Sequence, residues 1–319
     1  MKLRCCSSTL RALLLAAGLG ACGSGEASRG DPPAAESRAG DAPGAQTPVR
    51  ESNVEEVALD VAPASPCPEG MVLAASTFCV DRWEISLVDR ESGQPLSPYY
   101  PPDRRLALQV RDEWEKLRFR MGSKEAQQVP LPPLPSWQQD HDVDPIAVSR
   151  GGVIPSAYLS GLMVERACRN AGKRLCTARE WLAACEGEQR RPFPYGKAYR
   201  YGACNTFRPV HPAIELHGSP ILGHHDPRLD LVKDHEGDLL LRPTGATPAC
   251  KSEWGNDAIW DMNGNLDEWV DDPHGRLMGA FFARSRKHGC ESSIAEHPKA
   301  YFDYSTGGRC CAPRIAGRD

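Results

Sequence analysis

Residues 278–293, MGAFFARSRKHGCESS, hold a single cysteine, Cys290, next to a basic run. A sulfur in this setting has three chemistries open to it. It is a reactive thiolate where nearby positive charge lowers the thiol pKa, a ligand for a soft metal ion, or one half of a disulfide. The choice among them decides whether the chain performs redox chemistry or is held together by its sulfurs.

The N-terminus predicts export. Residues 1–21 begin with basic side chains, continue as an apolar stretch from Ala12 to Leu19 and end in small residues. This pattern is typical of a secretory signal and is too short for a membrane span. Residues 19–22, Leu-Gly-Ala-Cys, resemble the lipobox of bacterial lipoproteins, which implies cleavage before Cys22 and lipidation of its sulfur. The protein is then expected in the bacterial cell envelope, at the outer rather than the inner membrane. The alternative is an ordinary secreted protein.

The composition after the signal predicts a tether followed by one domain. Residues 22–66 contain no aromatic side chain and are rich in Ala, Pro, Gly, Ser and Glu, so they bury too little apolar surface to fold. The folded domain is expected over residues 67–319. The formal net charge is −4, and no basic surface is predicted, which excludes nucleic acid as an expected partner.

Cysteine usage is the strongest compositional signal. Of the thirteen cysteines, two leave with the signal and Cys22 is assigned to lipid. An even set of ten remains in an exported chain, which favours disulfides because the compartment is oxidising. Zinc is the rival interpretation, but no CxxC pair starts a compact site. The ten are Cys67, Cys79, Cys168, Cys176, Cys185, Cys204, Cys250, Cys290, Cys310 and Cys311.

A second group of residues with ligand chemistry lies at 211–235. It comprises His211, His217, His224, His225 and His235 with Asp226, Asp230 and Asp234. Imidazoles and carboxylates together are suitable ligands for a transition metal. The spacing matches no compact helical or hairpin site, so the sequence favours an exposed hydrophilic loop.

Several short elements must position these residues. Apolar runs within 67–86 predict strands, and residues 106–121 have helical spacing. A helix is expected over 155–175, with Leu159, Leu162, Met163 and Cys168 on one side and an end near Gly172. Thr177 and Glu180 form a capping-box pattern that opens a further helix to Cys185. Few long helices and many loops predict an irregular α+β domain.

Five segments carry a resemblance to one family. They are MVLAASTFCVDRWEIS (71–86), CRNAGKRLCTAREWLAAC (168–185), PFPYG with ACN (192–205), WGNDAIWDMNGNLDEWVDD (254–272) and GGRCCAPRI (307–315). In this order they resemble the sulfatase-modifying factors, the formylglycine-generating enzymes. The resemblance implies an irregular, loop-rich variant of the C-type-lectin fold, stabilised by disulfides.

The same resemblance argues against the family's chemistry. Active members bind copper through two cysteines that follow a Gly-Gly segment, and thiolates suit Cu(I). Here Gly279-Ala280 takes the place of Gly-Gly, and no cysteine lies between Phe281 and Gly289. Cys290 instead matches the family's structural cysteine. Copper is therefore not expected, and no catalytic residue is assigned.

The resemblance also implies two disulfides, Cys168–Cys310 and Cys185–Cys290. The other six cysteines are assigned by proximity and elimination to Cys67–Cys79, Cys204–Cys250 and Cys176–Cys311, although spacing alone does not fix connectivity.

Calcium is the one cofactor that the resemblance implies. The family pattern places its ligands at Asp261, Gly264, Leu266 and Glu268, and calcium prefers such hard oxygens. Asp267 stands where the family often has Trp. A simple Asx-Gly turn without an ion is the alternative. Asn205 is a weaker candidate for a second calcium site.

These expectations combine into a lipid-anchored envelope protein whose domain binds rather than catalyses. Its expected partners are the membrane, through the lipid, and an exported protein, peptide or glycan. Two enzymatic alternatives stay open: a copper- and oxygen-dependent oxidase that converts Cys or Ser of an exported protein to formylglycine, or another metal-dependent oxidase.

Overall fold

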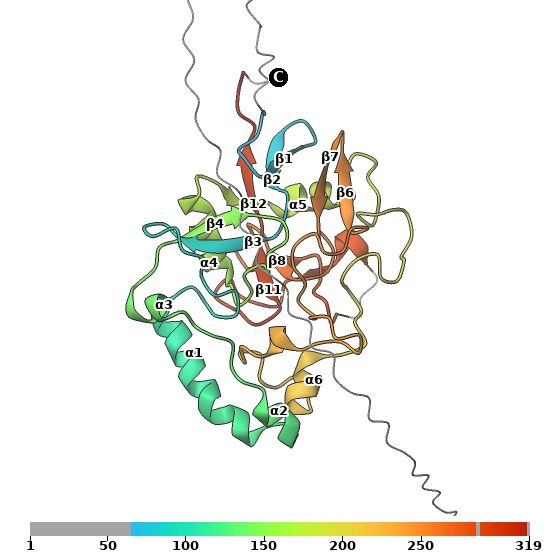
Figure 1. The fold of residues 1–319 in the computed structure, drawn as a ribbon. Helices are drawn as coiled ribbons and strands as arrows, with labels where there is room; N and C mark the ends of the chain where they lie inside the picture. The colour runs from blue at the N-terminus through green and yellow to red at the C-terminus, as the bar shows by residue number, and fades with distance from the viewer. Residues whose placement is uncertain (1–64, 285–287, 318–319) are drawn as a thin grey trace, which may run out of the picture. The chain divides into compact units, whose positions relative to one another are not determined.

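The two ends of the domain meet in one sheet. In the computed structural model, which describes residues 65–284 and 288–317, strands β1 (Met71–Ala74) and β2 (Phe78–Asp81) form a hairpin. The C-terminal strand β12 (Cys310–Pro313) pairs with β2 on one side and with β5 (Arg174–Leu175) on the other (Figure 1). The expected signal peptide, Cys22 and all but the last two residues of the tether lie outside the described residues.

A second sheet contains Asp267 and Glu268, two buried acidic residues. Its strand order is β10 (Ser293–Ile294), β9 (Leu277–Met278), β8 (Asp267–Trp269) and β11 (Thr306–Gly308). The β8–β11 pair is parallel, whereas the other two pairs are antiparallel. Two further antiparallel pairs contain the other four strands of the described residues. They are β3 (Ile85–Asp89) with β4 (Pro145–Ser149) and β6 (Lys251–Trp254) with β7 (Asp257–Trp260).

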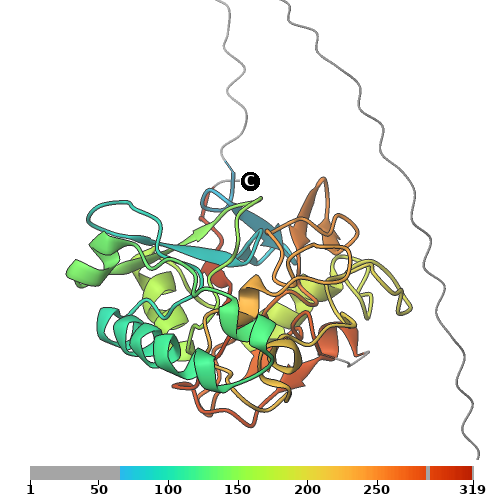
Figure 2. The same cartoon turned by 60° about the horizontal axis from the view of Figure 1, so that its bottom comes forward.

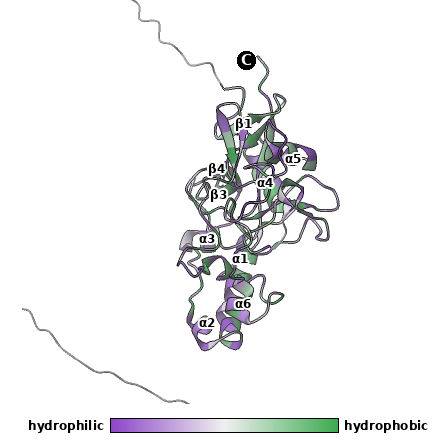
Figure 3. Cartoon of the chain, turned by 90° about the vertical axis from the view of Figure 1, so that its right-hand side faces the viewer, coloured by the Kyte–Doolittle hydropathy of each residue, from purple (hydrophilic) through white to green (hydrophobic). Residues whose placement is uncertain are grey.

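Helices of the N-terminal half extend away from the first sheet. Helix α1 (Arg104–Leu117) is capped by the Asp103 carboxylate and buries a stripe of Ala107, Val110 and Trp114. The 3-10 turn η1 (Arg118–Arg120), α2 (Lys124–Gln128) and α3 (Ser136–Asp140) follow. Figures 1 and 3 place α1, α2 and α6 together at the end of the domain opposite β1, and Figure 2 shows α1 and α2 from below. Among the described residues, no helix is long and apolar enough to cross a membrane.

The two helices predicted around Cys168 and Cys185 form, with one correction. Helix α5 (Ala178–Glu186) begins at the predicted capping box, since Thr177 and Glu180 exchange the two expected hydrogen bonds. Helix α4 (Gly161–Asn170) starts six residues later than predicted, because the Ser160 hydroxyl caps it and residues 155–160 are buried without helical structure. Leu162, expected on the buried side, is 53% exposed.

Five disulfides join the ten cysteines of the described residues. The predicted disulfide framework is therefore confirmed, and the pairs coincide with those named from the sequence. They are Cys67–Cys79, Cys168–Cys310, Cys176–Cys311, Cys185–Cys290 and Cys204–Cys250. Four of these bridges close loops of 46 to 142 residues, so they tie helices α4 and α5 and the middle of the chain to late segments.

The prediction of an exposed loop over the His-rich segment is wrong for most of its length. Residues 212–217 form α6 (Pro212–His217), and 229–231 form the 3-10 turn η2 (Leu229–Leu231). Leu216, Leu229 and Leu240 join a hydrophobic cluster there. Two charged residues of the segment, Asp226 and Arg228, are buried as an ion pair, whereas the buried Asp230 carboxylate has no hydrogen-bond partner among the described residues. Asp226 accepts from the Arg228 guanidinium, with both side chains fully buried. A last 3-10 turn, η3 (Gly289–Glu291), carries Cys290.

Candidate functional site

Strand β8 sends two consecutive carboxylates to opposite sides of its sheet. Asp267 is fully buried and Glu268 is 1% exposed. Because neighbouring residues of a strand face opposite ways, the two side chains meet different surroundings. The Glu268 side is a closed ionic centre, and the Asp267 side opens into a cavity.

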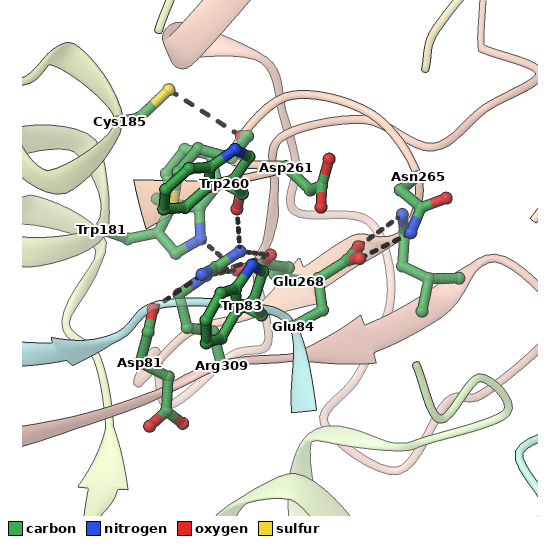
Figure 4. A network of polar contacts seen from close by, with 12 residues as sticks. Asp81, Trp83, Glu84, Trp181, Cys185, Trp260, Asp261, Asn265, Glu268 and Arg309 are labelled. Atoms are coloured by element: carbon green, nitrogen blue, oxygen red, sulfur yellow. Dashed lines mark hydrogen bonds and ion pairs between the residues drawn. The ribbon is translucent and has the colours of Figure 1, made fainter. Parts of the chain in front are cut away.

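Arg309 is the centre of the closed side. Its guanidinium is fully buried and contacts Glu268 through Nη2–Oε1 at 2.9 Å and Nε–Oε2 at 3.0 Å. The remaining donors go to the carbonyl oxygens of Asp81 and Trp260, at 2.7 and 2.8 Å. Trp181 Nε1 donates to Glu268 Oε2 at 2.7 Å, so both carboxylate oxygens are hydrogen bonded (Figure 4).

Two further carboxyl groups lie near this pair and face a large cost of ionisation. Burial raises the pKa of Glu84 well above its usual value, and repulsion from Asp261 and Glu268 raises it further. Burial also raises the pKa of Asp261 to about 6. The Glu84 oxygens accept from the backbone N–H of Leu266 and the side-chain amide of Asn265 (Figure 4). The Arg309 guanidinium therefore contacts one carboxylate directly, that of Glu268, and lies near two further carboxyl groups whose pKa values are raised.

Two side chains predicted to bind calcium, those of Glu268 and Asp261, already have protein partners. The Glu268 carboxylate faces a guanidinium instead of open space, and Asp261 Oδ2 accepts from the Gly245 N–H at 2.6 Å. Asn205 is brought close to Gly264, but its amide nitrogen donates to Leu240 and Asn265. No group of three or more His, Cys, Asp or Glu side chains within residues 65–284 and 288–317 is arranged to hold a metal ion. Calcium stays a prediction of the sequence.

On the other side of β8 lies a cavity of about 280 Å³. It is built from three stretches of chain: the segment around α6, the strands β8 and β9 with the loop that follows β9, and residues 294–306. The lining residues are His211, Pro220, His224, Asp267, Leu277, Phe281, Arg284, Ile294, His297, Tyr301, Asp303, Tyr304, Ser305 and Thr306.

Two carboxylates with one arginine set the charge of this cavity. Arg284 Nη2 forms an ion pair with Asp267 Oδ2. Burial raises the pKa of Asp267 to about 7, against the charge of Arg284 and with the help of repulsion from Asp303. The backbone N–H of Ala280 acts in the opposite direction, because it favours the charged form of Asp267 and so lowers its pKa. Asp303 is held by the Tyr301 hydroxyl at 2.5 Å and by the Ser305 hydroxyl at 2.7 Å.

Two consecutive residues beside the cavity have positive φ, and only the first of them is glycine. Ala280 has φ of +79° and is fully buried, directly after Gly279 at +99°. The left-handed region costs a residue with a Cβ about 1–3 kcal/mol unless its surroundings hold it there. The turn at 279–280, which the sequence comparison placed opposite the Gly-Gly segment, therefore persists although one glycine is lost.

The predicted histidine group is divided by the fold. His211 and His224 line the cavity, and burial lowers the pKa of His211, with a further contribution from His224. His217 lies elsewhere, 3.2 Å from Asp226 and next to Trp114. His225 and His235 are exposed. The segment supplies part of a pocket instead of a metal site.

Sequence reasoning missed several residues of this region: Arg284, Tyr301, Asp303, Tyr304 and Arg309. The only available signal was the position of Asp267, where the family often has Trp. Arg309 lies in the segment 307–315 but received no role from the sequence, and the other four lie outside all five family-like segments, so their association appears only in the folded chain.

Comparison with known proteins supports the family resemblance. A family profile for the sulfatase-modifying factor enzyme 1-like domain matches residues 161–310, which include every residue that lines the cavity. The match confirms the family that the sequence predicted. The structure confirms the prediction of an irregular α+β domain stabilised by disulfides. No curated protein matches the sequence.

Solved structures give only distant likenesses. The Major Tropism Determinant U1 variant has 14% identity and a TM-score of 0.39. The match covers 79% of this chain but only 55% of the length of that protein. PvdO from Pseudomonas aeruginosa has 14% identity and a TM-score of 0.32, with 74% and 80% of the two chains covered. CarF has 12% identity and a TM-score of 0.33, with 74% and 86% covered. These likenesses bear on neither activity nor ligand.

Proposed function

Because the chain carries a sulfatase-modifying factor enzyme 1-like domain, we propose that it is an envelope-anchored binding protein of this type without the copper oxidase chemistry. In this proposal the cavity beside Asp267 holds the ligand, a small molecule or one residue of an exported peptide.

One observation carries the proposal: the sulfur of Cys290 is already bonded. It forms a disulfide with Cys185 and is fully buried, and every other cysteine of the described residues is also in a disulfide. The copper site of the active family members uses two thiolates, which suit Cu(I), and the segment from Phe281 to Gly289 contains no cysteine. The sulfurs of the domain serve stability, at about 2–4 kcal/mol for a typical bridge.

The cavity supports binding as the retained task. Ligand sites are concave and mostly apolar, with a few placed polar groups. Here Leu277, Phe281 and Ile294 supply apolar wall, and Asp267 with Arg284 supply charge. The cavity is small, about 280 Å³, which suits a compact ligand better than an extended polymer.

The oxidase alternative is tested on the full-length processed protein, purified without reductant. Alkylation under denaturing conditions followed by peptide mass spectrometry is expected to label no thiol between residues 67 and 319. With Cu(I) present, oxygen uptake on a cysteine-containing peptide is expected to equal that of the protein-free control. The Cys290→Ser variant is the positive control for labelling, because it frees Cys185. Formylglycine in the peptide product would overturn the proposal in favour of an oxidase.

The anchor is tested separately by labelling cells with radioactive palmitate. The wild-type chain is expected to take up label and to fractionate with membranes, outer more than inner, whereas Cys22→Ser loses both properties. A Cys22→Ser protein that remains lipid-labelled would contradict the assignment of the lipid to this residue.

A further inference from the structure

Buried polar atoms without partners gather around the cavity beside Asp267. Asp267 Oδ1, Arg284 Nη1 and His211 Nδ1 are all buried, and none has a hydrogen-bond partner among the described residues. All three residues line the same cavity. Buried polar atoms are rarely left unpaired in native proteins, so a cluster of them indicates a missing partner.

The unpaired atoms are of opposite character. Asp267 and Arg284 bond to each other through Oδ2 and Nη2, which leaves Oδ1 as a free acceptor and Nη1 as a free donor. The side chains are 1% and 12% exposed, so bulk water reaches them poorly. The cavity therefore offers a negative acceptor and a positive donor that belong to one ion pair.

Other polar groups of the wall are already in use. Asp303 accepts from Tyr301 through Oδ2 and from Ser305 through Oδ1. The Thr306 hydroxyl donates to the Asp303 carbonyl, and His224 Nε2 lies 2.9 Å from the Pro220 carbonyl. A ligand can therefore form hydrogen bonds with the few unpaired atoms of Asp267, Arg284 and His211. The other polar groups named here already have partners, and the rest of the wall is largely apolar.

The charge pattern disfavours a ligand of one sign. A simple anion on Arg284 would lie near the Asp267 and Asp303 carboxylates, and a simple cation on Asp267 would lie near the Arg284 guanidinium. A ligand that carries both charges on neighbouring atoms avoids both repulsions. Neutral imidazole has one donor and one acceptor nitrogen, so His211 is compatible with either end of such a ligand.

We propose that this cavity binds a free α-amino acid, with the ligand carboxylate on Arg284 Nη1 and the ligand ammonium on Asp267 Oδ1. Its side chain lies against the apolar wall of Leu277, Phe281 and Ile294, which favours an aliphatic residue. This inference rests on the binding function proposed above and names its ligand class.

The test uses the full-length processed protein near pH 8 and two readouts, thermal unfolding and calorimetric titration. Each of the twenty common amino acids is screened singly. L-leucine is then compared with 3-methylbutylamine, which lacks the carboxylate, and with 4-methylpentanoate, which lacks the ammonium. We expect L-leucine to raise the unfolding temperature and each analogue to bind at least tenfold more weakly, because a buried polar group left unpaired penalises binding.

Matched variants separate the cavity from general charge effects. Asp267→Asn and Arg284→Gln are each expected to weaken L-leucine binding at least tenfold. Asp272→Asn and Arg276→Gln are the controls, since these residues form a more exposed ion pair at 3.1 Å outside the cavity. The controls are expected to bind L-leucine as the wild type does.

Several outcomes would overturn the amino-acid proposal. Equal binding of L-leucine and the amine would make the cavity a cation site, and equal binding of L-leucine and the acid would make it an anion site. If none of the twenty amino acids binds, the inference is wrong, while the proposed function is judged independently by the thiol and oxygen measurements. Formylglycine production would reject the proposed function whether or not an amino acid binds.

Discussion

Asp267 and Glu268 are adjacent on strand β8 and equally buried, yet the two carboxyl groups differ in how many of their oxygens have a hydrogen-bond partner. Glu268 accepts hydrogen bonds on both oxygens, from Arg309 and Trp181. Asp267 has one oxygen paired with Arg284 and one without a partner among the described residues. The difference between a structural and a candidate ligand-binding carboxylate is therefore the supply of donors, since burial is the same.

On the Glu268 side, both carboxylate oxygens are hydrogen bonded, and this pairing is expected to stabilise the fold. Removing one partner of a buried ion pair is strongly destabilising because it leaves a charge that nothing compensates. On the open side, Asp267 is already partly uncompensated, and its raised pKa allows it to become neutral. The same mutation is thus expected to have unequal effects on the two sides.

The largest effect is expected from Arg309→Met. Loss of the guanidinium leaves the buried Glu268 side chain without its cationic partner, which should lower the free energy of unfolding by about 3–5 kcal/mol. Urea unfolding of disulfide-intact protein measures this. Arg276→Gln, which breaks a more exposed pair, is the control and should cost about 0–1 kcal/mol. A cost for Arg309→Met as small as the control's would show that the closed side does not depend on its ion pair.

The next effect compares Glu268→Gln with Asp267→Asn near pH 8. Glu268→Gln leaves Arg309 as an unpaired charge that is fully buried, so we expect a loss of about 3 kcal/mol. Asp267→Asn removes a carboxylate that is costly to ionise, so we expect a change within about 1 kcal/mol. The measurement is the urea midpoint of both variants in the same buffer. Equal losses would remove the distinction between the two sides.

The pH dependence sharpens the same distinction. The pKa of Asp267 is about 7 in the folded protein and near 3.8 when unfolded, so the folded state binds more protons between these values. Its contribution to stability therefore falls as pH rises from about 4 to about 7. Relative to wild type, Asp267→Asn should gain about 2–3 kcal/mol of stability from pH 5 to pH 8, at roughly 1.4 kcal/mol per pH unit below 7.

The Asp267 contribution is isolated by taking the difference between variant and wild type at each pH. The raised pKa values of Asp261 and Glu84 act in the same direction but are shared by both proteins, so they cancel. A pH-independent difference would mean that Asp267 is ionised throughout, and the cavity would then be more polar than its burial indicates.

A smaller effect than that of Glu268→Gln is expected from Tyr301→Phe. The lost hydroxyl donates to Asp303 Oδ2 at 2.5 Å on a half-buried ring, and a hydrogen bond of this kind contributes about 0.5–1.5 kcal/mol. Chemical denaturation measures the change, and His297, which stacks on Tyr301 at 3.8 Å, should keep its place because the ring remains. A loss above the one for Glu268→Gln would show that the cavity wall is the more rigid side.

Local sequence signals were reliable where the physical cause is local. The Thr177–Glu180 capping box fixed the start of α5, and the cysteine number in an exported chain indicated a disulfide framework. The start of α4 was placed too early, because the cap at Ser160 is a weaker pattern than the apolar spacing before it. The burial of Asp226 and Arg228 within 211–235 does not follow from the hydrophilic composition, because the composition does not show which charges pair inside the protein.

The sequence by itself determined the family, the presence of ten cysteines in the expected domain and the absence of cysteine between Phe281 and Gly289, since each depends on residue identity and order. Only the tertiary structure decided that Glu268 meets Arg309 while Asp267 meets Arg284 and an open cavity. The reason is physical. The ionic state and pairing of a buried carboxylate depend on which distant segments supply donors, and strands β8 and β11, the α6 segment and the loop after β9 come together only through folding.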